Sequence, residues 1–495
     1  EIIFGFSIYI ILLNYFFFFV KQNIFFFAIF IIGISIILLL IKYFKKDSFL
    51  DLNKKFIIFF IINIIVSSLV IFYGSQFYVF RGNIYDFFSY LSTASIIAEL
   101  NLKEISEVLS DKNFNDILLK EYANFAYARP SVQIFIANVS KITNANMFIN
   151  GFMLKSISLL LTFAASYSFF AKYFKETNLR LICSLGFIFS SFFLYIYEID
   201  ALAHLLSVPL AIIIFKNLME LEFNNNKNLF FKCLLISFYS SAFFIIYPEG
   251  AVVILCPVSI YVLYEIFINN KIYTYQKYKL LFSSLILFFL ITFPLYESTY
   301  KYLIFNQFSN SLNSTKDYWG YYGAFILGKA NPIYDYQVVN EVKNLWQQNS
   351  SISELLFFIK NANIENGNKY FFINIIPSIF GFYHLSTTNV ENLIDYLLVI
   401  ILIFLNLYLI IKFYFKLKNL FSIHNPINNF YKIFLVYLIF TSFYFLFSKN
   451  YWTVIKLYTY SSFFAYFFLI YDFKKNSFIN KFLVILLIFF PIYKF

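Results

Sequence analysis

The sequence predicts an all-α integral membrane protein, and two observations lead to that fold class. Of its 495 residues, 61% are hydrophobic and only 13% are charged, whereas a soluble domain carries about 25% charged residues. The apolar residues are also gathered in runs of roughly 20, the length that an α-helix needs to cross a bilayer. A polytopic bundle of transmembrane helices is therefore expected.

About 13 apolar runs are candidate spanning helices. The connections between them form two classes, which alternate along the whole chain. One class is short and rich in lysine, and the other is very short or very long with nearly balanced charges. Because basic connections stay in the cytoplasm, the second class is expected to face outward. The candidate spans are 2–20, 24–41, 56–73, 148–171, 181–197, 201–218, 229–247, 250–268, 279–296, 394–415, 430–447, 455–472 and 481–494.

The charge pattern bears on possible partners. The net charge of +12 does not indicate nucleic-acid binding, because the lysines lie in short connections on one side of the membrane. The excess of Phe, Ile, Tyr, Asn and Lys fits AT-rich codon usage. Only three arginines occur, so each is informative, because lysine serves wherever a charge alone is needed.

The spans and connections divide the chain into four parts. Residues 1–54 hold two spans and a basic cytoplasmic loop, and residues 55–296 form a core module that includes the long external loop 74–147. A second long external loop, 297–393, precedes the C-terminal spans of 394–495. Helical apolar spacing over 83–109 and 336–359 predicts amphipathic helices on the membrane surface.

The beginning of the sequence carries two expectations. It starts at Glu1 without a methionine, so we expect a fragment or a trimmed chain. The first apolar run is long and has no small-residue cleavage site, so it is interpreted as a span and not as a signal peptide.

Uncommon polar residues collect at the outward ends of the predicted spans. Charges at membrane depth cost a few kcal/mol each, so they tend to line cavities and to pair. A cavity with carboxylates and cations at bilayer level would suit an anionic head on an isoprenoid tail. The candidate site residues are Arg81, Asp86, Arg129, Glu198, Asp200, His204, Tyr247, Glu249, Tyr451 and Lys456.

Several of these residues also have an ordinary structural interpretation. Asn83 and Asp86 match a capping box with Asp in place of Glu, which would start a helix. Arg81 could snorkel to the membrane interface. Glu198 and Asp200 could belong to a solvated turn.

The later candidates have structural alternatives too. His204 could be a hydrogen-bonded core residue, and Glu249 could be a first-turn helix carboxylate. Lys456 is unfavourable at a helix start, which favours a phosphate-binding role. The sequence has no phosphate-cradling Gly-rich loop, HExxH or GxSxG motif, and no metal-ligand spacing is present.

Two stretches carry a resemblance to a known class of enzymes. RGNIYDFFSYLSTASII (81–97) and YARPSVQIFIANV (127–139), set in a long external loop among many spans, resemble the GT-C class of membrane glycosyltransferases. That class has an acidic residue just after a helix, matched here by Asp86, and a basic-proline return to the membrane, matched by Arg129. The elements YPEG (247–250) and YWTVIK (451–456) also look like elements of large bacterial members.

The resemblance implies transfer of a sugar from a polyprenyl-phosphate donor to a glycan, lipid or protein acceptor at the outer face of a bacterial inner membrane. Asp86 would be the general base on the acceptor hydroxyl, with inversion at the sugar carbon. Arg129, Lys456 and Arg81 would hold the phosphate leaving group. Such a donor needs no cofactor. The resemblance leaves open whether a divalent cation binds. Membrane lipids are expected as surroundings, and no nucleic acid is expected.

Two other functions compete with this one. A polysaccharide polymerase or ligase would also use external arginines, but loop 297–393 contains none. A lipid-linked oligosaccharide flippase or other transporter would place ionisable residues along a path through the membrane and have roughly symmetric halves.

Overall fold

The computed structural model describes helices through most of the first 300 residues and in part of the C-terminal region. The residues that it describes are 2–20, 27, 29–30, 33, 61, 84–100, 102–110, 130–144, 146–188, 196, 201–221, 226–269, 274–300, 400, 404, 407–408, 410–412, 414–418, 420, 426–447, 464 and 466–468. These residues form helices and turns, and none of them forms a β-strand. The all-α class is therefore confirmed for this part of the chain.

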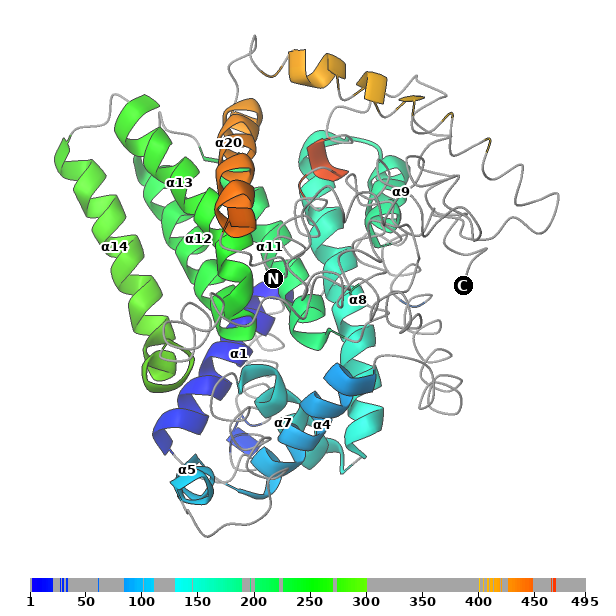
Figure 1. Ribbon diagram of the computed structural model, residues 1–495, viewed down its shortest axis with the longest axis vertical. Helices are drawn as coiled ribbons and strands as arrows, with labels where there is room; N and C mark the ends of the chain where they lie inside the picture. Colours follow the sequence, from blue (N-terminus) through cyan, green and yellow to red (C-terminus); the bar gives the residue numbers. More distant parts are fainter. Residues whose placement is uncertain are drawn as a thin grey trace, which may run out of the picture.

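Ten helices of the described part carry the argument below (Figure 1). They are α1 (Ile2–Tyr15), α4 (Ile84–Glu99), α5 (Leu102–Ser110), α7 (Ser131–Thr143), α8 (Met147–Tyr173), α9 (Thr177–Ile188), α11 (Leu202–Met219), α12 (Asn226–Ile246), α14 (Thr274–Thr292) and α20 (Pro426–Phe447). Between α12 and α14 lies the short helix α13 (Cys256–Tyr264). A 3₁₀ turn and a π-helical turn precede it, and a π-helical turn follows it. A π-helical turn, Phe16–Val20, continues α1.

Six helices of the described part are long and apolar enough to cross a membrane. They coincide with six predicted spans, and α8 and α11 begin within one residue of the predicted starts. Several apolar helices of this kind indicate an integral membrane protein. Two further predicted spans are described in other terms: 181–197 is described to residue 188, in the shorter apolar helix α9, and 430–447 lies within α20. The predicted total of 13 also depends on runs 24–41, 56–73, 394–415, 455–472 and 481–494, which lie wholly or largely outside the described residues.

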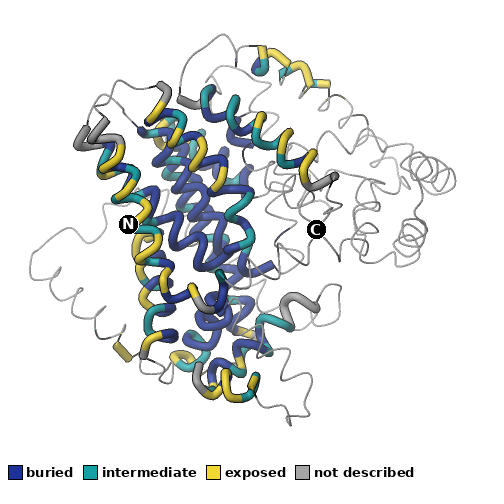
Figure 2. The backbone as a smooth tube through the Cα atoms, turned by 60° about the vertical axis from the view of Figure 1, so that its left-hand side comes forward, coloured by how far each residue is buried: buried dark blue, intermediate teal, exposed yellow. Residues whose placement is uncertain are grey.

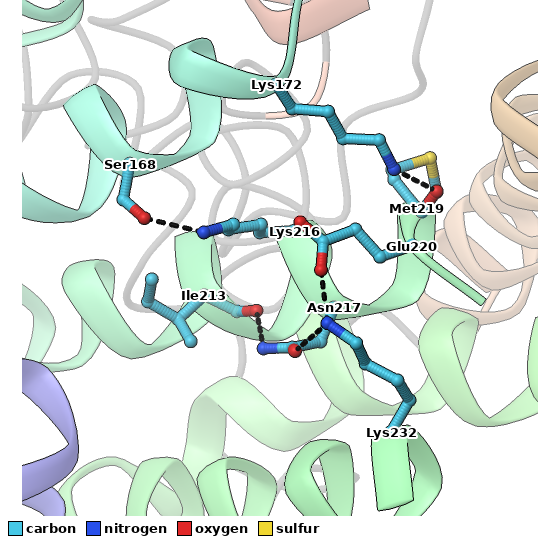
Figure 3. A network of polar contacts seen from close by, with 8 residues as sticks. All are labelled: Ser168, Lys172, Ile213, Lys216, Asn217, Met219, Glu220 and Lys232. Carbon is cyan, nitrogen blue, oxygen red and sulfur yellow. Dashed lines mark hydrogen bonds and ion pairs between the residues drawn. The ribbon is translucent and has the colours of Figure 1, made fainter. Parts of the chain in front are cut away.

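Two polar contacts show that α8 and α11 run parallel (Figure 3). Lys216 Nζ donates to Ser168 Oγ at 2.7 Å, and Lys172 Nζ donates to the Met219 carbonyl at 2.7 Å. The paired residues differ by 47 or 48 positions, and both contacts lie near the C-terminal ends. The start of α11 therefore lies at the opposite end of the bundle beside the N-terminal part of α8, which extends about two turns further.

Helix α12 runs antiparallel to α11. Near its start, Lys232 forms an ion pair with Glu220, and its Nζ lies 3.3 Å from Asn217 Oδ1. Directly after its last residue, Tyr247 meets His204 of the first turn of α11, with 4.1 Å between ring centroids. One end of the bundle therefore gathers the start of α11 and the N-terminal part of α8 with the end of α12.

The first long loop supplies helices that pack at this same end (Figure 1). Helices α4 and α5 confirm the helical spacing predicted over 83–109, and the predicted cap Asn83 lies outside the described residues. Helix α7 follows Pro130 and is buried from Ser131 to Asn138. It ends at Asn144, whose φ of 53° is left-handed, and α8 begins three residues later.

Helices α4 and α7 point in the same direction. Glu99, the last residue of α4, forms an ion pair with Lys141 near the end of α7, with 2.9 Å between Oε1 and Nζ. Because α4 packs along α7, a contact between their C-terminal ends places their first turns at one end as well. Buried Ser131 of α7 also donates to Asn14 Oδ1 of α1 at 2.8 Å.

The burial pattern distinguishes the centre of the bundle from its outer faces (Figure 2). Helix α11 is buried along most of its length, whereas α14 and α20 expose large apolar side chains such as Phe282, Leu290 and Phe440. Exposed apolar side chains of this kind fit contact with lipid and not with water. Helix α11 forms part of the protein core.

Candidate functional site

An aromatic pair lies at the end of the bundle that the first loop covers. Tyr247 is 3% exposed, and its ring meets the ring of partly buried His204 edge to face, with 63° between the planes. Both residues belong to the predicted site, and the structure brings them together from the end of α12 and the start of α11. His204 thus has an imidazole–phenol contact in place of a purely apolar setting.

The stretch YPEG forms the tight turn that the sequence predicts between two spans. Tyr247 leaves the helix with φ −141° and ψ 78°, and Pro248 then starts a single 3₁₀ turn, Pro248–Gly250. A π-helical turn, Ala251–Leu255, leads on into α13. Glu249 therefore stands at the N-terminal end of a helical segment, where the peptide dipoles favour a carboxylate.

Gly250 makes room for the buried tyrosine. A Cβ atom at this position would lie 2.3 Å from Tyr247 Cδ1 and 3.0 Å from Phe243 Cζ. No side chain is tolerated at the first distance without movement of the ring, and the ring is enclosed by its neighbours. The glycine thus fixes the position of Tyr247 against His204.

Substitution of Gly250 by Ala is expected to destabilise the protein by about 1–3 kcal/mol, the usual cost of overpacking. Chemical denaturation of the purified protein in detergent would measure this loss. In a Tyr247→Ala background the same substitution should cost less than half as much, because the obstructing ring is gone. An equal cost in both backgrounds would show that the Tyr247 contact does not determine the need for glycine.

The proposed general base lies in α4, the helix that packs along α7. Asp86 is the third residue of α4, so its backbone is described, but its side chain lies outside the described residues. Arg129 immediately precedes Pro130, the residue before α7. The remaining predicted site residues that lie outside the described residues are Arg81, Arg129, Glu198, Asp200, Tyr451 and Lys456.

Lys155 is a candidate that the sequence interpretation missed. It is 3% exposed and lies within α8, inside the predicted span 148–171. Continued along the two packed helices, the offset of 47 or 48 positions puts it at about the level of residues 202 and 203, at the start of α11. A single lysine in an apolar run was a sufficient signal, because an ionisable residue at membrane depth is usually functional.

The side chains around Lys155 show that it faces protein. Ser158, Thr162 and Ser166 follow it at three, seven and eleven residues, which is one face of a helix, and each is fully buried. Its own Nζ lies 5.9 Å from the centroid of the Phe152 ring. Lys155 therefore does not snorkel to the lipid boundary, since a snorkelling lysine exposes its ammonium group.

These residues offer a defined set of chemical groups. An imidazole (His204), a phenol (Tyr247) and a carboxylate (Glu249) lie at the junction of α11 and α12, and the neighbouring helix α8 carries a buried cation (Lys155). Such a set can hold an anionic group and hydrogen-bond a polyol. Within the described ranges, no group of three or more His, Cys, Asp or Glu side chains could hold a metal ion.

Comparison of the chain with protein-family models, with curated proteins and with solved structures finds no match.

Proposed function

We propose that the chain is a membrane glycosyltransferase that moves a sugar from a polyprenyl-phosphate donor to an acceptor hydroxyl at the outward end of the bundle. The observations that support this most are the contact of His204 with Tyr247 beside the turn that carries Glu249, and the buried ammonium of Lys155 in the neighbouring helix α8. A phosphate on a lipid tail would bind a cation at the membrane boundary, and the sugar beside it would use the polar and aromatic side chains.

In the proposed step, Asp86 is the general base. Its carboxylate takes the proton of the acceptor hydroxyl while the hydroxyl oxygen bonds to the anomeric carbon. The bond between that carbon and the phosphate oxygen breaks, and its electron pair leaves with the polyprenyl monophosphate. Attack opposite the leaving group inverts the anomeric carbon. The cations that would stabilise the developing phosphate charge are Arg81, Arg129, Lys155 and Lys456.

The test is a transfer assay with the full chain in nanodiscs. A radiolabelled pool of polyprenyl-phosphate sugars is supplied with an extract of envelope glycans and lipids, and label is expected to move to an acceptor. Loss of transfer on addition of a chelator would reveal a divalent cation. Label that crosses the bilayer of proteoliposomes without transfer would favour a flippase, and transfer only from diphosphate-linked oligosaccharides would favour a polymerase.

A further inference from the structure

A second group of charged side chains lies at the other end of the bundle (Figure 3). Lys172 of α8, Lys216 of α11 and Lys232 of α12 meet around Glu220, the residue that follows α11. We call these four residues the lysine cluster. Three ammonium groups and one carboxylate give it a formal charge of +2.

The contacts hold the three ammonium groups in defined positions. Lys232 is paired with Glu220, Lys216 donates to a hydroxyl and Lys172 donates to a main-chain carbonyl. The Ser168 hydroxyl is a neutral acceptor, so this contact orients Lys216 without cancelling its charge. The side chains of Lys232 and Glu220 are 26% and 23% exposed, which leaves the cluster within reach of a ligand.

Helix dipoles reduce this charge without removing it. The cluster lies at the C-terminal ends of α8 and α11, each equivalent to about half a negative charge, and near the N-terminal end of α12, equivalent to about half a positive charge. The sum is between one and two positive charges, by order of magnitude. Arg180, whose Nε donates to the Phe174 carbonyl at 2.7 Å, adds another cation after α8.

The level of the lysine cluster along the candidate spans indicates which kind of anion it would meet. Lys172 and Lys216 lie in the last turn of their candidate spans, and Lys232 is the fourth residue of the span Leu229–Ile246. This is the level at which the apolar part of each helix ends, and therefore the level of phospholipid phosphates. Basic groups between transmembrane helices at this depth attract anionic headgroups.

We propose that the lysine cluster binds the phosphodiester headgroup of an anionic phospholipid. The ammonium groups act as point charges on the phosphate oxygens, and the acyl chains lie against the apolar helix surfaces. This site lies at the opposite end of the bundle from His204 and Tyr247, and it does not depend on the reaction that the protein catalyses.

The experiment uses the full chain in nanodiscs of phosphatidylcholine, alone or mixed with phosphatidylglycerol. Native mass spectrometry is expected to show retained phosphatidylglycerol, and the melting temperature should rise in the mixed lipid. Each of the variants Lys216→Gln and Lys232→Gln should lower the phosphatidylglycerol affinity about fivefold. Lys279→Gln, which removes a cation at the start of α14 outside the cluster, should keep the wild-type affinity.

Glu220→Gln separates a lipid site from a purely structural one. Removal of the only carboxylate of the cluster should raise the phosphatidylglycerol affinity about fivefold, even if the variant is less stable. A cluster that only fastens helices would give an equal loss of melting temperature in both lipids and an unchanged affinity, and that result would overturn the proposal. So would wild-type affinity in the two lysine variants, or equal stabilisation by inorganic phosphate in phosphatidylcholine nanodiscs.

Discussion

Replacement of Asp86 by Asn is expected to lower kcat for sugar transfer by about 10²–10⁴-fold, the usual contribution of a general base. The amide keeps the size of the side chain but cannot accept the proton of the acceptor hydroxyl. Donor binding should change little, because the role proposed for the carboxylate is on the acceptor and not on the lipid phosphate. Steady-state transfer kinetics in nanodiscs, with donor binding measured separately, would check both quantities.

A control for this substitution is available in the same helix. Glu99→Gln removes a carboxylate from the last residue of α4, where it forms a largely exposed ion pair with Lys141. Such pairs contribute little to stability, so transfer should stay within about twofold of the wild type. Full transfer by the Asp86→Asn protein would refute the assignment of the base, whereas loss of transfer in both variants would point to damage to α4.

The second large effect is expected for Lys155→Gln. Loss of the buried ammonium should weaken binding of the polyprenyl-phosphate donor by about 10–100-fold, because hydrogen bonds to charged groups are worth about 1.5–3 kcal/mol. Lys155→Arg keeps the charge and should retain more of the affinity than Lys155→Gln. Binding of polyprenyl phosphate, followed as a ligand-dependent rise in melting temperature, measures this without any need for turnover.

A matched control for Lys155 is the lysine at the start of α14. Lys279 stands 5.8 Å from the centroid of the Phe230 ring, much as Lys155 stands 5.9 Å from Phe152. Lys279→Gln should therefore leave donor binding unchanged. The Lys155→Gln variant could instead bind polyprenyl phosphate as tightly as the wild type and show only a lower melting temperature. Lys155 would then stabilise the fold and not bind the donor.

The sequence predicted the membrane-spanning helices of the described part well, because bilayer thickness sets their length. It predicted the starts of α8 and α11 to within one residue. It did not predict their register, because a row of small polar residues on α8 shows that this face meets protein but not which residues of which helix it meets. The register depends on single contacts, such as the one between Lys216 and Ser168.

The candidate site was predictable in part. His204 and Tyr247 were singled out because polar residues at helix ends are uncommon in an apolar chain, and the structure places their rings 4.1 Å apart. Lys155 escaped because one charge within a long apolar run changes its mean hydropathy little. The close fit of Gly250 to the Tyr247 ring is a property of packing, which residue types alone do not encode.

The fastening of α11 and α12 at both ends has a consequence for how this chain can evolve. Lys216 and His204, twelve residues apart on α11, each contact a neighbouring helix, as Lys232 and Tyr247 do at the two ends of α12. One inserted or deleted residue between them would turn His204 by about 100° and shift it by about 1.5 Å relative to Tyr247. The apolar residues between these contacts can therefore be exchanged for other apolar residues during evolution. The number of residues between the contacts has to stay the same.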